Sequence, residues 1–479
     1  MIKLELIGND YKYEIENIIQ LFFPEQKVSF VSGDFAKISV FKYQLSLSVS
    51  VRIFGKFHFK QASAYIESDS ERLLCKLLFE ILSEVTGLLP KWGIQTGVRP
   101  TKLLRNLINK HGEKYAEDFM KNKMLISDEK FKLAEDIVAL QDDLLKEYKE
   151  NSFSLYISIP FCASRCSYCS FISHDISKSK NLIPDYVEML LKEIEQTAEI
   201  AKELGFNLQT VYIGGGTPTV LSAEQLEVIM QAVHKHFDTS DLLEFTVEAG
   251  RPDTITKDKL IAIKDNGATR ISINPQTLND EVLKIIKRNH TVKQFFDAYE
   301  LAKSLGFDNI NTDLIAGLPG DSFESFCDSL ERITELSPAD ITVHCLSVKR
   351  SSTLVYNGNE QYNPEGKVVS DMLGFSQEIL RECGYNPYYM YRQSKMSGNN
   401  ENIGWAKPGF ESYYNMFIME EIQTILALGA GGSTKLVKNG KIERVFNYKY
   451  PYEYIRGFNE IVNRKQKICD FFSETVDFN

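Results

Sequence analysis

Apolar and polar positions follow one pattern before about residue 150 and another after it. In the first part, stretches rich in Val, Phe and Ser with partial alternation predict strands, at residues 27–31, 36–40 and 44–52. A helix should follow, because Ser68 and Glu71 have the spacing of a capping box, a stripe of Leu and Ile comes after them, and Gly87 lies beyond its end. We therefore expect a small N-terminal α+β domain over residues 1–150.

From residue 151 on, short β-rich runs alternate with helices, which is typical of βα units around a parallel sheet. Six strands are predicted, at residues 154–159, 210–213, 244–247, 270–273, 309–314 and 340–345. The helices between them carry start and stop signals, at Pro184, Ser222 with Gln225, Asn279, Thr291 with Gln294, and at Gly205, Gly267 and Gly306. Because six units are fewer than the eight of a closed barrel, we expect an α/β fold with an open, partial (β/α)6 barrel over residues 151–365 and a site at the carboxyl ends of its strands.

The last part, residues 366–479, is less regular and is predicted to be a C-terminal extension that covers the substrate. The chain has a net charge of −10 and no Lys/Arg-rich block, so we do not expect a nucleic-acid partner. The N-terminus lacks the charged and apolar regions of a signal peptide, and no apolar run reaches the about 18 residues of a membrane span. These features predict a cytoplasmic protein without a membrane span.

Three of the eight cysteines, Cys162, Cys166 and Cys169, directly follow the first predicted barrel strand. Closely spaced thiols in a reducing compartment indicate a metal site. Three thiolates can hold three irons of a [4Fe–4S] cluster and leave the fourth iron open to a small ligand such as S-adenosylmethionine (SAM), whereas an electron-transfer cluster normally uses four cysteines. Two alternatives stay open at this point: a structural zinc site completed by His174, and cysteines that are simply buried.

A glycine run, Gly214-Gly215-Gly216-Thr217-Pro218-Thr219, follows the second predicted barrel strand. Glycines let the backbone approach a ligand closely and present N–H groups to a carboxylate. A tight turn would explain the run equally well. Its place one βα unit after the cysteine loop favours a contact with the methionyl group of SAM.

Three motifs carry a family resemblance. They read Tyr156-Ile157-x-Ile159-Pro160-Phe161-Cys162-x3-Cys166-x-Tyr168-Cys169-x-Phe171, Gly214-Gly215-Gly216-Thr217-Pro218-Thr219 and Asp313-Leu314-Ile315-x-Gly317-Leu318-Pro319. Over about residues 152–440 the chain resembles the radical SAM family of oxygen-independent coproporphyrinogen III oxidases. The stretch Gly97-Val98-Arg99-Pro100-Thr101-Lys102 resembles the branch of this family called coproporphyrinogen dehydrogenase HemZ.

The resemblance implies a set of ligand residues. The cluster ligands would be Cys162, Cys166 and Cys169. Tyr156 would line the first SAM, and Tyr168 would be an aromatic residue beside the cofactor. Gly215, Gly216 and Thr217 would meet the aminocarboxylate of SAM, and Glu248 would accept hydrogen bonds from a cofactor group. Gln276, Arg288 and Asp313 match positions that hold a second SAM in the family. The chain departs from the family at Ser158, where a histidine is usual.

Some of these residues have plain structural alternatives. Glu248 could pair with Arg251 or Arg270, Arg288 could be solvated at a helix end, and Asp313 could cap the turn before Gly317. No fourth cysteine follows Cys169, because Ser170 and Phe171 come next. In the related heme-chaperone branch a histidine follows the Lys-Pro-Gly-Phe-Glu-Ser stretch, and here that position is Tyr414, so the heme-iron ligand of that branch is lost.

The activity that the resemblance implies is the oxidative decarboxylation of coproporphyrinogen III to protoporphyrinogen IX in heme biosynthesis, supported by an electron donor such as flavodoxin or ferredoxin. The carboxylates of this tetrapyrrole call for cationic partners, and the candidates are Arg251, Arg288, Lys349, Arg350 and Arg392. No catalytic side chain is predicted. A heme-binding chaperone and another radical SAM enzyme that acts on a tetrapyrrole are the alternatives. The N-terminal domain could be a lid, a redox-partner dock or a packing appendage, and residues 92–102 are our candidate for its contact with the barrel mouth.

Overall fold

The structure, a computed structural model, describes residues 1–170, 174–347, 366–393 and 396–473. The chain forms two compact units. The first comprises residues 1–139, 362–371 and 390–402, and the second comprises residues 140–361, 372–389 and 403–479. The chain therefore returns to the first unit after it has entered the second. The division into domains 1–150, 151–365 and 366–479 stays a proposal.

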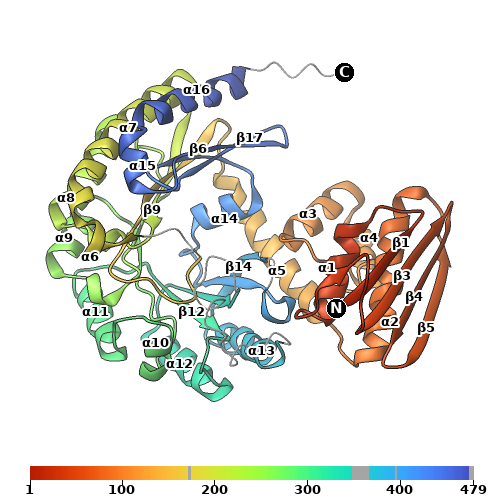
Figure 1. Ribbon diagram of the computed structural model, residues 1–479. Coiled ribbons are helices and arrows are strands. Elements are labelled where there is room, and N and C mark those ends of the chain that lie inside the picture. The colour runs from red at the N-terminus through yellow and green to blue at the C-terminus, as the bar shows by residue number, and fades with distance from the viewer. Residues whose placement is uncertain (171–173, 348–365, 394–395, 474–479) are drawn as a thin grey trace. The chain divides into compact units, whose positions relative to one another are not determined.

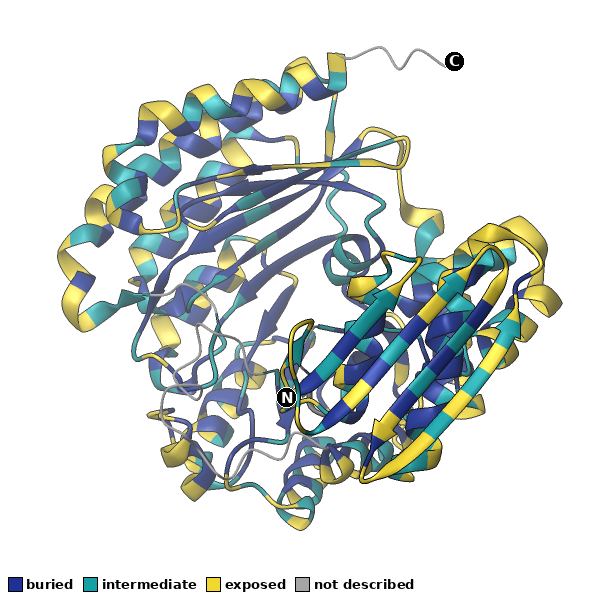
Figure 2. Cartoon of the chain, turned by 45° about the vertical axis from the view of Figure 1, so that its right-hand side comes forward, coloured by how far each residue is buried: buried dark blue, intermediate teal, exposed yellow. Residues whose placement is uncertain are grey.

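A five-stranded sheet in the order β2-β1-β3-β4-β5 forms the first unit. Its strands are β1 (Ile2–Ile7), β2 (Val28–Ser29), β3 (Ala36–Tyr43), β4 (Ser46–Ile53) and β5 (Lys56–Ser63). Helices α1 (Lys12–Phe22) and α2 (Ser70–Thr86) cover one face of this sheet (Figure 1). Buried and exposed residues alternate along the strands, so one face meets the helices and the other meets solvent (Figure 2). Strands β2, β3 and β4 confirm the three predicted strands, while β1 and β5 were not predicted.

The predicted capping box before α2 is wrong. A 3-10 turn, η1 (Glu67–Asp69), leads directly into the helix, and the residue that precedes the helix, Asp69, makes no side-chain capping bond. Ser68 lies inside that turn and so lacks the extended conformation of a capping residue. The predicted end is confirmed, because Gly87 has a φ of 72° and its N–H donates to the carbonyl of Ser83.

The segment after this helix is also helical. It contains α3 (Pro100–His111), α4 (Glu113–Asp118), a short π-helical turn η2 (Phe119–Lys123), α5 (Asp128–Leu144) and η3 (Leu145–Glu147). The turn-rich stretch 92–102 lies against residues 390–402 of the same unit. Trp92 Nε1 donates to Glu401 Oε2 over 2.7 Å, and the Lys130 ammonium lies 2.6 Å from Glu401 Oε1. Contact of this stretch with the barrel mouth stays a prediction.

An eleven-stranded sheet in the order β14-β15-β13-β12-β11-β10-β9-β6-β16-β17-β18 forms the frame of the second unit. Its parallel part contains the six predicted barrel strands as β6 (Ser152–Ile159), β9 (Asn207–Gly215), β10 (Glu244–Glu248), β11 (Arg270–Ser272), β12 (Ile310–Ala316) and β13 (Asp340–Cys345). Each is hydrogen-bonded in parallel to the next. All six predicted strands are confirmed, and their carboxyl ends therefore lie at one edge.

Helices connect the parallel strands and lie on the outer side of the curved sheet (Figure 1). They are α7 (Ile183–Glu203), α8 (Ala223–His236), α9 (Lys257–Asp265), α10 (Asp280–Ile285), α11 (Val292–Ser304) and α12 (Phe323–Leu336). The predicted capping boxes at Ser222 and Thr291 are both formed, and Asn279 caps α10. None of the helices in the described ranges is long and apolar enough to cross a membrane.

The C-terminal extension is more regular than its sequence predicts. It contains α13 (Lys367–Glu382), β14 (Asn386–Tyr391), η8 (Ser397–Asn399), β15 (Asn402–Ala406), α14 (Tyr413–Glu420), β16 (Thr424–Leu428), β17 (Ser433–Lys438), β18 (Lys441–Phe446), α15 (Pro451–Arg456) and α16 (Phe458–Ser473). Strand β16 pairs in parallel with β6, the strand that leads to the cysteines. The extension therefore adds strands at both ends of the parallel sheet.

A buried carboxylate fastens the end of the chain to helix α7. Glu193 accepts hydrogen bonds from Tyr454, Asn447 and the backbone N–H of Gly429, and the Lys465 ammonium lies 2.9 Å from its Oε1. Both charged groups are almost fully buried. Because these partners come from different elements of the extension, this one side chain holds the extension against the barrel.

Candidate active site

The cysteine loop leaves the carboxyl end of β6 through Pro160 and the short strand β7 (Phe161–Cys162). Cys162 and Cys166 are buried, and Cys169 is half-buried. The Thr217 hydroxyl donates to Cys162 Sγ over 3.5 Å, and the Thr217 N–H donates to the carbonyl of Phe161 over 2.8 Å. The loop is therefore held against the chain that follows β9.

The glycine run after β9 permits this close approach. A Cβ on Gly216 would lie 2.5 Å from the Phe161 carbonyl oxygen and 3.0 Å from Cys162 Sγ. Gly215 has a φ of 108°, and a Cβ on Gly214 would lie 2.8 Å from Glu248 Oε2. Glycine is thus required at these positions because a larger residue would clash with the cysteine loop or with Glu248, whether or not a ligand is bound.

The three thiols fit an iron–sulfur cluster better than a single metal ion. Within the described part of the chain, no group of three or more His, Cys, Asp or Glu side chains is arranged to hold one metal ion. The ring of His174 lies perpendicular to the rings of Tyr450 and Tyr452, at centroid distances of 5.6 and 6.3 Å. A [4Fe–4S] cluster binds one thiolate to each of three separate irons and does not require the sulfurs to converge on one ion.

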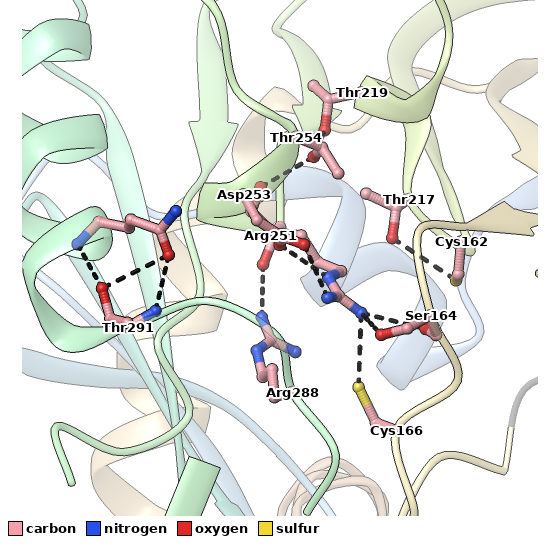
Figure 3. A network of polar contacts seen from close by, with 12 residues as sticks. Cys162, Ser164, Cys166, Thr217, Thr219, Arg251, Asp253, Thr254, Arg288 and Thr291 are labelled. Carbon is pink, nitrogen blue, oxygen red and sulfur yellow. Dashed lines mark hydrogen bonds and ion pairs between the residues drawn. The ribbon is translucent and has the colours of Figure 1, made fainter. Parts of the chain in front are cut away.

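Two buried arginines brace the cysteine loop and the neighbouring strand ends (Figure 3). Arg251 forms a two-pronged ion pair with Asp253 and donates to Ser164. Arg288 donates to the Tyr168 hydroxyl over 3.0 Å, and it also donates to the carbonyls of Gly250 and Asn274. Arg288 is therefore not a solvated helix-end residue, and Arg251 is not the partner of Glu248.

These contacts also correct most of the predicted substrate cations. Arg251 and Arg288 direct their donors to protein groups, as described above. Arg392 donates to the carbonyls of Gln95, Gly97 and Asn399 within the first unit. Because these guanidinium groups are occupied by the protein, the structure does not support them as partners of substrate carboxylates. Lys349 and Arg350 lie outside the described residues.

A stack of tyrosines lies beside Glu248 at the strand ends. The ring of Tyr212 is 4.5 Å from that of Tyr414 and 6.2 Å from that of Tyr156, centroid to centroid. The Tyr212 hydroxyl donates to Glu248 Oε1 over 2.6 Å. Burial raises the pKa of Glu248 to about 7, although this hydrogen bond opposes the rise. Neither Arg251 nor Arg270 binds Glu248, because Arg270 pairs with Asp340.

The sequence did not indicate Tyr212, yet its contacts make it part of the site. Tyr212 occupies β9 two residues before the glycine run, on the strand face that it shares with Gly214. This alternation is the one signal that would have found it. Tyr414, which stands where the heme-chaperone branch has a histidine, is buried in the same stack.

Two of the residues predicted for a second SAM lie on neighbouring parts of the sheet: Gln276 follows β11, and Asp313 lies within β12. The Gln276 N–H donates to the Asp313 carbonyl, and Gln276 has a φ of 70°, which is uncommon for a residue other than glycine. Its Oε1 is buried without a hydrogen-bond partner among the described residues. Strained backbone and an unsatisfied amide oxygen are typical of a ligand site.

A histidine that the sequence reasoning missed faces this pair. His344 Nε2 lies 3.6 Å from Asp313 Oδ2, and Asn311 donates to Asp313 Oδ1 over 2.8 Å. Burial tends to raise the pKa of Asp313, but His344 and Asn311 outweigh burial and lower it. Asp313 therefore does not serve as a turn cap before Gly317.

Ser158, the departure from the family pattern, has a structural contact. Its hydroxyl donates to the Ala430 carbonyl over 2.8 Å, and its own carbonyl accepts from Tyr186 over 2.6 Å. Ser158 thereby ties the strand before the cysteines to the loop that Glu193 holds. The ligand roles predicted for the site residues stay predictions.

Comparison with known proteins identifies the relatives of this chain. A family model described as the radical SAM superfamily matches residues 156–333. The Bacillus subtilis (strain 168) protein named "Oxygen-independent coproporphyrinogen-III oxidase-like protein HemZ" is 36% identical over 99% of this chain and 99% of its own length. The protein named "Heme chaperone HemW" of Lactococcus lactis is 35% identical over 58% of this chain and 69% of its own length.

The solved structures support the fold. The Escherichia coli coproporphyrinogen III oxidase HemN, described as a radical SAM enzyme, matches with a TM-score of 0.53 and 24% identity over 67% of this chain and 72% of its own. Since this identity is low, the match supports the radical SAM fold and carries no conclusion about the substrate.

Proposed function

Because this chain belongs to the HemZ branch of the radical SAM oxygen-independent coproporphyrinogen III oxidase family, we propose that it converts propionate side chains of coproporphyrinogen III into vinyl groups. Two such conversions give protoporphyrinogen IX, an intermediate of heme biosynthesis. The single observation that carries the proposal is the identity of 36% with the HemZ protein over essentially the whole length of both chains. The relatives named as heme chaperones match only part of this chain.

The family's cofactors are a [4Fe–4S] cluster and SAM, and the cysteine loop fits the cluster. When bound, they supply a carbon-centred radical that can remove a hydrogen atom from an unactivated carbon. Each propionate loses one hydrogen atom, one carbon dioxide molecule and one electron, and a vinyl group remains. The reaction therefore requires an electron donor, such as flavodoxin or ferredoxin, and an acceptor for the electron released.

The residues of this chain have distinct tasks in the proposal. Cys162, Cys166 and Cys169 hold the cluster. The backbone of Gly215 and Gly216, together with Thr217, would receive the amino and carboxylate groups of SAM. The Glu248 carboxylate accepts a hydrogen bond from SAM, and the Tyr212 hydroxyl orients this carboxylate by donating to its Oε1.

The remaining site residues shape the space around the cofactor. The tyrosine stack excludes water from the neighbourhood of a reactive carbon radical. Gln276 and Asp313 are proposed to hold a second SAM molecule, while Tyr156 lines the first and Tyr168 lies beside the cofactor. Arg288, whose terminal nitrogens donate to protein groups, is proposed to position Tyr168 instead of binding the second SAM directly. The cysteines must stay reduced before the cluster is assembled, so we also propose that the protein works in the cytoplasm.

A heme-binding role is the second candidate, because the heme chaperones are similar over the barrel. The burial of Tyr414 between aromatic rings opposes this role, since a phenol in that stack does not replace an accessible imidazole ligand. A radical SAM enzyme with another tetrapyrrole substrate is a further possibility that product analysis distinguishes.

The test is an anaerobic assay of the cluster-loaded protein with SAM, a reductant and coproporphyrinogen III. Mass spectrometry should find loss of two carboxyl groups together with 5′-deoxyadenosine, and Cys166→Ala should abolish both. Formation of 5′-deoxyadenosine without decarboxylation would show that the radical chemistry acts on a different substrate. Heme binding without either product would support the chaperone role instead.

A further inference from the structure

Arg251 links the end of β10 to the cysteine loop, although 85 residues separate it from Cys166. Its side chain is almost fully buried, with 4% of its surface exposed. One of its terminal nitrogens, Nη1, lies 3.0 Å from the Ser164 carbonyl oxygen, 2.9 Å from Ser164 Oγ and 3.9 Å from Cys166 Sγ. Figure 3 shows the guanidinium between Ser164 and Asp253, with Cys166 below it.

Asp253 fixes the orientation of this guanidinium. Nε and Nη2 of Arg251 donate to the two carboxylate oxygens of Asp253 over 3.0 and 2.9 Å. Because the guanidinium group is planar and rigid, holding one edge on Asp253 directs the other edge at the loop. A lysine has the same charge but lacks the planar set of donors, so it cannot bind Asp253 and the cysteine loop at the same time.

The position of Arg251 matters for an electron-transfer step. A cation and an N–H donor beside a ligating thiolate stabilise the reduced, more negative state of an iron–sulfur cluster. Groups that hydrogen-bond to ligands also fix their orientation and strengthen metal binding. Arg251 is able to do both, because it contacts the loop backbone and the sulfur of one ligand.

We propose that Arg251 is a positioning residue that holds the cysteine loop and raises the reduction potential of the cluster through its contact with Cys166. Asp253 orients Arg251 for both tasks. The inference rests on the cluster assignment and does not depend on which molecule the enzyme decarboxylates.

The test compares Arg251→Gln with the wild-type full-length protein after anaerobic cluster reconstitution. Circular dichroism first establishes that the variant is folded. The two readouts are the rate of iron loss to a chelator and the reduction potential from a redox titration followed by electron paramagnetic resonance. We expect iron loss to accelerate about 10-fold or more, as for other partners of metal ligands, and the potential to become more negative.

Three further variants separate the parts of the proposal. Arg251→Lys should have a reduction potential between those of Arg251→Gln and the wild type, because lysine restores the positive charge. It should lose iron as fast as Arg251→Gln, because lysine cannot bind Asp253 and the cysteine loop at the same time. Asp253→Asn releases the edge of Arg251 that Asp253 holds, so it should accelerate iron loss in the direction of Arg251→Gln by a smaller amount. Iron loss in this variant is the readout to use if Arg251→Gln does not fold. Ser164→Ala removes one hydroxyl contact but keeps the contact with Cys166, so its potential should match that of the wild type.

A wild-type potential and a wild-type rate of iron loss in folded Arg251→Gln would overturn the inference. A change in Ser164→Ala as large as that in Arg251→Gln would also overturn it, because the effect would then belong to any disturbance of the loop. Failure of the wild-type protein to decarboxylate coproporphyrinogen III would reject the proposed substrate and leave these measurements intact.

Discussion

Replacement of Tyr212 by phenylalanine tests whether Glu248 must be ionised to bind SAM. The variant keeps the stacked ring but removes the hydroxyl that donates to Glu248. This hydrogen bond stabilises the carboxylate, so its loss raises the pKa of Glu248 above its value of about 7. If the carboxylate binds SAM, affinity increases as pH rises through this pKa and decreases below it.

The size of the shift follows from the strength of the lost bond. A hydrogen bond to a charged group contributes about 1.5–3 kcal/mol, and one pKa unit corresponds to about 1.4 kcal/mol. The pH midpoint of SAM affinity should therefore rise by about 1–2 units in Tyr212→Phe. At pH 7 the ionised fraction of Glu248 then decreases about 5- to 50-fold relative to the wild type, and SAM affinity should weaken accordingly.

The assay measures the dissociation constant of SAM from the cluster-loaded protein between pH 6 and pH 9. Tyr414→Phe is the matched control, because it alters the same stack and leaves the hydrogen bond between Tyr212 and Glu248 in place. Its midpoint should stay close to that of the wild type. An unchanged or lowered midpoint in Tyr212→Phe would refute the assignment of Glu248.

Two other predictions address the framework of the site. Lys465→Met leaves the Glu193 carboxylate buried without its cation. This should destabilise the second unit by about 3–5 kcal/mol, which denaturant unfolding measures. Adding Glu193→Gln to the Lys465→Met chain should restore part of the lost stability. Gly216→Ala places a Cβ 2.5 Å from the Phe161 carbonyl and should reduce the iron content after reconstitution. Gly374→Ala, where nothing lies within 4 Å, should retain full iron content. Equal iron in both alanine variants would contradict the role of the glycine run.

The local parts of this structure could be predicted from the sequence. The strand 340–345 has the same bounds in the prediction and in the structure, because Ile341, Val343 and Cys345 alternate with polar residues directly after the Ser337-Pro338 turn. The capping residues Ser222 and Thr291 were found because a capping box needs only four consecutive residues. Ser68 and Glu71 have the same spacing, but the 3-10 turn before α2 displaces the helix start.

The polar partners within the site could not be predicted, because they are distant in the sequence. The pair of Arg251 and Ser164 is separated by 87 residues, and that of Arg288 and Tyr168 by 120. Charge alone suggested that both arginines bind substrate carboxylates. Only the fold shows that protein groups already use their donors.

In the proposed reaction, the radical chemistry of this family removes a hydrogen atom from a propionate side chain. The most direct measurement supplies coproporphyrinogen III with deuterium at the propionate carbon next to the ring and analyses the 5′-deoxyadenosine by mass spectrometry. Deuterium should appear in 5′-deoxyadenosine in step with the formation of vinyl groups. Unlabelled 5′-deoxyadenosine beside unchanged coproporphyrinogen would contradict it.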